Sequence, residues 1–258
     1  MTFPIIAGAE PWSHDTGREG ATDRRGAVVV HGLTGNPGSM RGVAEALADA
    51  GFDIEMPLLP GHGTVVEDML PTRWADWVAE GEAAYERLRQ RAEHIVVVGL
   101  SVGGALTLRL GADHPDAAGL VCVNPVTKPQ APEIIEMLRG MVDGGTTMLP
   151  GVGSDIADPG STENAYDGMP VEPLLSLLVD GIEPLSYEYA TMRVPLLLLT
   201  SPQDHVVEPI NGDFLAENYG GPIERISLDR SYHVATQDYD KDLIFKATVE
   251  FATRVAAQ

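Results

Sequence analysis

The sequence predicts an α/β fold, a mostly parallel open sheet flanked by helices, with a helical segment inserted late in the chain. Two patterns carry this prediction. Short apolar runs alternate with longer stretches of helical periodicity, and runs such as 27–30, 95–98 and 120–123 are continuously apolar. A strand that is apolar at every position is buried on both faces, as the strands of a parallel sheet are.

The expected elements follow one another in strand-then-helix order. The predicted strands are 27–30, 52–56, 95–98, 120–123, 195–200 and 223–228. The predicted helices are 39–50, 74–90, 102–113, 209–219 and 240–256. Because parallel strands need a crossover between them, this order favours helices on both faces of one sheet.

The alternation breaks once, after Pro125, and resumes at Met192. The intervening residues show no clear strand but contain three apolar segments that we expect to be helical. These segments are 132–141, 161–168 and 172–182. A structureless loop of this length is improbable in a compact domain, so we expect residues 1–125 and 192–258 to form the core and residues 126–191 an inserted helical cap.

The charge of the chain excludes one class of partner. Its 17 Lys and Arg residues stand against 38 Asp and Glu residues, which gives a formal net charge of −21. Binding to nucleic acid needs clustered cations that replace counterions on phosphates, and the longest basic run is the pair Arg24 and Arg25. We therefore expect no nucleic-acid partner and at most transient contact with a lipid surface.

Cysteine usage and hydropathy indicate the compartment. Cys122 is the single cysteine, so no intrachain disulfide and no cysteine-based zinc site are expected. No stretch approaches the roughly 18 uncharged apolar residues of a transmembrane helix. We expect a protein of the reducing cytoplasm.

The motif with the clearest chemistry is Gly99-Leu-Ser-Val-Gly-Gly104, between a predicted strand and a predicted helix. A serine at such a sharp turn points outward with strained backbone angles, and glycines two positions away avoid clashes. A dinucleotide-binding loop would require glycine where Ser101 stands. The context predicts that Ser101 is a catalytic nucleophile.

A serine hydroxyl needs a base, and the base needs a group that orients it. Asp204 follows the strand 195–200, and His233 follows the strand 223–228. The carboxyl ends of parallel strands lie at one edge of the sheet, so both side chains are expected beside Ser101.

Three other histidines need an interpretation. His205 adjoins Asp204 but is expected on the wrong side of its loop to be the partner of this acid, so we interpret it as structural. His62, in Gly61-His-Gly63, is expected to shape a loop or the pocket rim. His31 ends the first strand and is expected to support the glycine-rich loop that follows.

That loop is expected to approach the nucleophile and complete the site. A tetrahedral intermediate carries a developing oxyanion, which preorganised N–H donors stabilise. The expected donors are the backbone N–H groups of Val102, directly after the nucleophile, and of Leu33.

Taken together, these motifs closely resemble the α/β-hydrolase superfamily, and within it the bacterial monoacylglycerol lipase and small carboxylesterase group. The resemblance extends over residues 26–256. The matching stretches are His31–Met40, Pro60–Gly63, Glu67–Met69, Asp76–Val78, Gly99–Gly104, Asp204–Val207 and Ser231–Thr236.

The resemblance implies the α/β-hydrolase fold, the triad Ser101, Asp204 and His233, and a lid formed by the insertion. It also places Val152 against the acyl chain and Glu163 against the glycerol moiety. The expected function is that of a serine carboxylic-ester hydrolase for neutral acyl esters such as monoacylglycerols, with no cofactor and no metal. A thioesterase or amidase with the same triad is the alternative, and a ligand-binding protein without catalysis is a further one.

Overall fold

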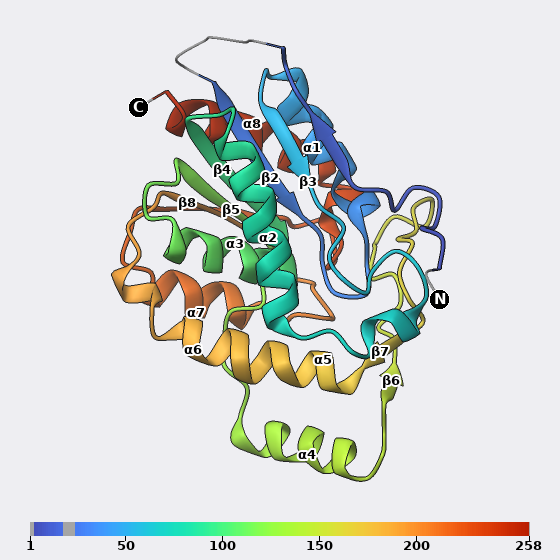
Figure 1. Ribbon diagram of the computed structural model, residues 1–258. Coiled ribbons are helices and arrows are strands. Elements are labelled where there is room, and N and C mark those ends of the chain that lie inside the picture. The colour runs from blue at the N-terminus through green and yellow to red at the C-terminus, as the bar shows by residue number, and fades with distance from the viewer. Residues whose placement is uncertain (1–2, 18–23, 258) are drawn as a thin grey trace.

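The computed structural model describes residues 3–17 and 24–257. Its centre is a seven-stranded sheet in the order β1-β3-β2-β4-β5-β8-β9 (Figure 1). All neighbouring strands are parallel except β1, which pairs antiparallel with β3 at one edge. The predicted fold class is therefore confirmed.

The strands of this sheet agree closely with the predicted ones. Their bounds are β1 Trp12–His14, β2 Arg25–Val30, β3 Asp53–Met56, β4 His94–Leu100, β5 Gly119–Val123, β8 Leu196–Thr200 and β9 Ile223–Ser227. Only β1 was missing from the prediction. It is three residues long and only partly buried, so it carries no apolar run.

Helices cover both faces of the sheet (Figure 1). Their bounds are α1 Arg41–Asp49, α2 Trp74–Arg89, α3 Val102–Asp113, α7 Ile210–Asn218 and α8 Lys241–Val255. Short 3-10 turns η1 Pro37–Met40, η2 Val66–Met69 and η5 Ala235–Gln237 lie in the connecting loops. Each predicted helix of the core is present within two residues of its expected bounds.

The sheet separates two apolar cores. Val28 and Val30 of β2 join the core under α2, α3 and α7, whereas Ala27 and Val29 join the core under α1 and α8. Successive side chains of a strand point to opposite faces, so a continuously apolar strand supplies both cores at once. This double burial explains why the central runs of the sequence do not alternate.

Residues 126–191, called the insertion below, lie between β5 and β8. Their elements are α4 Pro132–Asp143, β6 Met148–Pro150, β7 Gly168–Pro170, α5 Val171–Ser176, the π-helical turn η3 Leu177–Ile182, α6 Glu183–Ser186 and η4 Tyr189–Thr191. Helices were expected at 132–141 and 172–182, and both are present. Figure 1 shows α4 and α5 together beyond one end of the sheet.

Two expectations for the insertion were wrong. Residues 161–168 form no helix, because this stretch runs as an extended loop into β7. The insertion also contains a small antiparallel ribbon of β6 and β7, where no strand was expected. Each strand has three residues and includes a proline, so neither has the length or the alternation of a recognisable strand.

In the described ranges 3–17 and 24–257, no helix has the length and apolar character required to cross a membrane.

Candidate active site

Ser101 lies at the sharp turn between β4 and α3. Its backbone adopts φ 57° and ψ −116°, a strained conformation for a residue with a side chain. Its N–H donates to the carbonyl of Val123 at the end of β5, 2.9 Å away. The turn thus places the hydroxyl at the carboxyl edge of the sheet, as the sequence motif predicted.

Glycines make this turn possible because backbone segments pass very close to it. A Cβ at Gly99 would lie 2.0 Å from the carbonyl oxygen of Gly103, and one at Gly103 would lie 2.3 Å from the carbonyl oxygen of Val30. At Gly32 a Cβ would meet the Ser101 Cβ at 3.3 Å. The loop after β2 therefore packs directly against the serine.

Asp204 and His233 are joined as the sequence predicted. Nδ1 of His233 donates to Oδ2 of Asp204 at 2.7 Å, and both side chains are buried. The second oxygen, Oδ1, accepts the N–H groups of Val206 and Val207, each at 2.8 Å. These bonds fix the acid in one orientation and leave Nε2 of His233 as the ring nitrogen that is free to act as a base.

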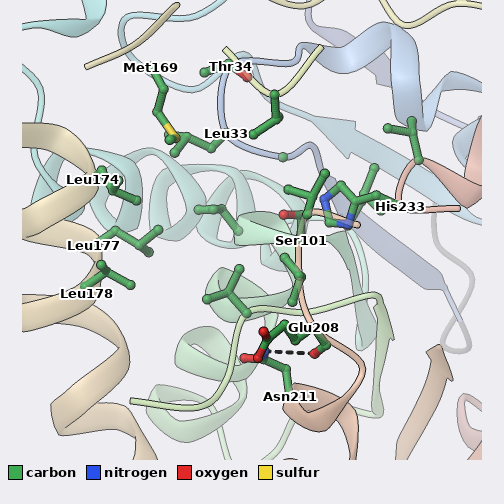
Figure 2. A pocket seen from close by; sticks show the side chains of 18 of the residues that line it. Leu33, Thr34, Ser101, Met169, Leu174, Leu177, Leu178, Glu208, Asn211 and His233 are labelled. Carbon is green, nitrogen blue, oxygen red and sulfur yellow. Dashed lines mark hydrogen bonds between the residues drawn. The ribbon is translucent and has the colours of Figure 1, made fainter. Parts of the chain in front are cut away.

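Ser101 and His233 line the same cavity and lie close together in Figure 2. The structure therefore brings together the three predicted triad residues from the ends of β4, β8 and β9. His205 takes no part in this group: its Nδ1 lies 2.8 Å from Oδ1 of Asp155.

Sequence reasoning missed Asn124, which holds the His233 loop from one side. Asn124 follows β5 and has φ 43°. Its amide donates to the carbonyl of His233 at 2.8 Å, and its Oδ1 accepts the N–H of Ser201 at 2.7 Å. Its position directly after an apolar strand is the signal that could have identified it, since asparagine tolerates left-handed backbone angles.

The aspartates around this loop were also missed. Asp238 is fully buried, and its carboxylate accepts the N–H groups of Tyr232 at 2.9 Å and of Ala157 at 2.7 Å. Asp155 accepts the N–H of His233 at 3.1 Å. No sequence pattern marked these residues, because they bond to backbone N–H groups, and Ala157 and His233 lie far from their acceptors along the chain.

The predicted oxyanion-hole residues, Leu33 and Val102, both border the cavity beside Ser101. His31 supports the first of them. Its Nδ1 donates to the carbonyl of Gly32 at 2.9 Å, and its Nε2 accepts the N–H of Leu59 at 3.2 Å. These two bonds use the neutral ring, and they confirm that His31 is structural support for the loop.

His62 lies beside His31, with 4.9 Å between the ring centres. Burial lowers the pKa of His31 to about 4. Burial, with the neighbouring His31 ring, lowers the pKa of His62 to about 3. The Nδ1 of His62 donates to the carbonyl of Pro60 at 3.1 Å, which fits a loop-shaping role.

The cavity has a volume of about 430 Å³. One end is apolar, with Leu174, Leu177, Leu178 and Met169 on one side of Ser101 in Figure 2, and Glu208 and Asn211 lie at another end. Both predicted lid residues, Val152 and Glu163, line it as well.

Among the titratable side chains that line the cavity, Glu163 has a clearly shifted pKa. Burial raises its pKa to about 7, while the positive charge available on His233 and a hydrogen bond from Ser39 oppose this rise. Its Oε1 occupies the space over Gly35, where a Cβ would come within 2.6 Å. Glu163 thus changes its charge near neutral pH at the wall of the cavity.

Among residues 3–17 and 24–257, the His, Cys, Asp and Glu side chains form no group of three that could hold a metal ion.

Comparison with known proteins identifies the family. The family model described as serine aminopeptidase, S33, matches residues 22–153. The thermostable monoacylglycerol lipase of Bacillus sp. (strain H-257) is 39% identical over 257 residues, which cover 98% of each chain. The chain belongs to this family of α/β hydrolases.

Further similarities agree with this assignment. The carboxylesterase of Bacillus subtilis (strain 168) is 23% identical and covers 90% of this chain and 93% of its own. A structure solved in a study of the metagenome-derived lipolytic enzymes LipS and LipT has a TM-score of 0.88 and 35% identity, and covers 97% of this α/β hydrolase and 100% of its own chain. The protein is a carboxylic-ester hydrolase, as the sequence motifs predicted.

We predict that Gly103→Ala destabilises this α/β hydrolase by about 2 kcal/mol or more, because the added methyl group would overlap backbone oxygens that have little room to move. Gly140→Ala is the matched control. Nothing lies within 4 Å of a Cβ at Gly140, in helix α4, so this change should be neutral or stabilising by up to about 1 kcal/mol. Urea unfolding measures both, and equal midpoints for the two variants would contradict the prediction.

The buried neutral histidines predict sensitivity to acid. In the unfolded chain they take up protons near pH 6.5, whereas in the folded protein His31 and His62 do so only near pH 4 and 3. The unfolded state therefore binds more protons in this window, so the free energy of unfolding falls as the pH falls below 6.5, by about 1.4 kcal/mol per pH unit for each histidine. His62→Gln should reduce this slope. An unchanged slope in urea unfolding between pH 6.5 and 4.5 would disprove the assignment.

Proposed function

We propose that this enzyme hydrolyses neutral acyl esters, with monoacylglycerols as the leading class, through an acyl-enzyme on Ser101. The observation that carries the proposal is the 2.7 Å bond between His233 and Asp204 at a cavity that Ser101 also lines. The names of the relatives, a monoacylglycerol lipase and a carboxylesterase, support this substrate class.

In the proposed mechanism, the Ser101 hydroxyl attacks the ester carbonyl carbon while Nε2 of His233 accepts its proton. Asp204 holds the ring in the required tautomer and stabilises its positive charge. The N–H groups of Leu33 and Val102 stabilise the oxyanion of the tetrahedral intermediate. The intermediate collapses, and the alcohol leaves with the proton from His233.

The second half of the reaction repeats these roles with water. His233 accepts a proton from a water molecule, which attacks the acyl-enzyme carbonyl and forms a second tetrahedral intermediate. When this intermediate collapses, the Ser101 oxygen regains the proton and the carboxylic acid is released. Every step uses side chains and backbone groups of this chain, and the reaction needs no cofactor.

We assign the apolar end of the cavity to the acyl chain. Leu174, Leu177 and Leu178 come from α5 and η3, and Met169 comes from β7, so the insertion supplies much of this wall. A methionine adapts its shape to irregular ligands, which suits acyl chains of different length. We accordingly propose that residues 126–191 act as a substrate-binding cap on a core of residues 1–125 and 192–258.

The residues Val152 and Glu163 take the roles that the resemblance implies. Val152 would contact the acyl chain, and its side chain is half exposed at the cavity. Glu163 would bind the hydroxyl groups of glycerol, for which a carboxylate is a strong acceptor.

A cytoplasmic location is supported by the single buried thiol of Cys122 and is proposed on that basis.

The mechanism predicts that Ser101→Ala lowers the kcat for ester hydrolysis by at least about 10³-fold, because the acyl-enzyme cannot form. The measurement is a panel of p-nitrophenyl esters and monoacylglycerols of graded chain length, together with an acyl thioester and an anilide. Unfolding curves of the variant provide the control for folding.

Two results of this panel would overturn the proposal. Activity retained by the Ser101→Ala variant would exclude the serine mechanism. Turnover of the thioester or the anilide far above that of every oxygen ester would move the assignment to a thioesterase or an amidase.

A second prediction concerns the alcohol part of the substrate. Glu163→Gln keeps the size of the side chain over Gly35 but removes the charge. At pH 8.5, where a carboxyl group with a pKa of about 7 is ionised, we expect kcat/KM for a monoacylglycerol to fall about tenfold, the equivalent of about 1.4 kcal/mol for one charge-assisted hydrogen bond. A p-nitrophenyl ester of the same acyl chain lacks glycerol and should change by less than about threefold. Equal losses on both substrates would refute the assigned role of Glu163.

A further inference from the structure

Asp155 of the insertion contacts both loops that carry the proposed acid and base. Its Oδ2 accepts the N–H of His233 and the N–H of His205, each at 3.1 Å. Its Oδ1 lies 2.8 Å from Nδ1 of His205, and its carbonyl accepts the N–H of Val234 at 3.0 Å. One residue from outside the core therefore bonds to the base itself and to the residue directly after the acid.

The separation of these two loops determines the geometry of the triad. Asp204 follows β8 and His233 follows β9, so their 2.7 Å bond depends on how the two loops are held. Asn124 bonds to the carbonyl of His233, and Asp155 bonds to its N–H. The backbone of the base is thus held from opposite sides by a residue of the core and a residue of the insertion.

The Asp155 carboxylate is largely shielded from water. Its side chain is 11% exposed, and hydrogen bonds to a carboxylate in such a place are stronger than those between neutral groups. The His205 ring packs edge-on against Tyr232, with 4.5 Å between ring centres. Removing the carboxylate would leave the N–H groups of His205 and His233 without this acceptor.

Asp155 is also close along the chain to the wall of the substrate cavity, because Val152 and Gly153 line that cavity. The same short segment therefore contacts both the cavity and the catalytic loops. Contacts that a substrate makes with Val152 would act on a segment that is bonded to the base.

We propose that Asp155 is a positioning residue, which aligns His233 with Asp204 and Ser101 by bonding the insertion to both catalytic loops. This inference rests on the proposed serine mechanism. Asp155 has no contact with the reacting atoms in this proposal, so its effect must pass through the alignment of His233 with Asp204 and Ser101.

The test compares Asp155→Ala and Asp155→Asn with the wild type on one p-nitrophenyl ester. The alanine variant should lose about 10- to 100-fold in kcat, the scale of a misplaced catalytic group, with KM within about threefold of the wild type. An asparagine oxygen in the place of Oδ2 can still accept both N–H groups, so Asp155→Asn should stay within about threefold of the wild-type kcat. If Asp155→Ala does not fold at the assay temperature, Asp155→Ser is used with the same thresholds, since its hydroxyl is too short to reach both loops.

Asp158→Ala is the matched control. Asp158 lies in the same segment, and its carboxylate accepts the exposed N–H of Gly160 at 2.9 Å. Removing this carboxylate takes one negative charge from the same loop and leaves the contacts of the catalytic loops in place. Its kcat should therefore equal that of the wild type within about twofold.

A double-mutant comparison separates positioning from general destabilisation. In a His233→Ala background, Asp155→Ala should change the residual rate by less than about twofold, because the group that it positions is absent. The same 10- to 100-fold loss in both backgrounds would overturn the inference, as would a folded Asp155→Ala variant with more than half of the wild-type kcat. A Ser101→Ala variant that keeps full activity would instead overturn the proposed function itself.

Discussion

The close approach of backbone segments around Ser101 is the constraint on which the rest of the site depends. The turn between β4 and α3 holds Ser101 at φ 57°, and the start of α3 lies against the end of β2. The first two segments could not approach this closely if Gly99 and Gly103 carried side chains, and a side chain at Gly32 would crowd Ser101. Ser101, the start of α3 and the loop after β2 are consequently fixed relative to one another by packing of the core.

The proposed base, His233, is held in a different way. Buried carboxylates and an asparagine bond to the backbone of the His233 loop, so polar groups replace apolar packing at this part of the site. In a chain with a net charge of −21, both Asp238 and Asp155 accept hydrogen bonds from backbone N–H groups, and Asp155 also pairs with the His205 ring. Hydrogen bonds are directional, so they can fix the orientation of the His233 ring.

Most of the fold and the triad could be predicted from the sequence because local signals mark them. Doubly buried strands are apolar throughout, and the motif Gly99–Gly104 lies between a strand and a helix. Ser101, Asp204 and His233 could therefore be placed at one edge of the sheet. The ribbon of β6 and β7 could not be predicted, because strands of three residues are too short to show periodicity. Asp155 and Asn124 could not be predicted for another reason. Most of their partners are backbone groups of loops that lie 50 or more residues away in the sequence, and no local pattern indicates which distant loop a side chain will reach.

The insertion divides into two parts with different attachments. Asp155 bonds to the loops that carry Asp204 and His233, and Tyr166 bonds to the loops at Thr34 and Gly61. Helix α4 instead packs on α5 at the periphery and lines the cavity with Ile134 and Leu138 (Figure 1). Substitutions in α4 can therefore reshape the cavity without moving the proposed triad. An architecture of this kind lets new substrate preferences evolve while the catalytic machinery is inherited intact.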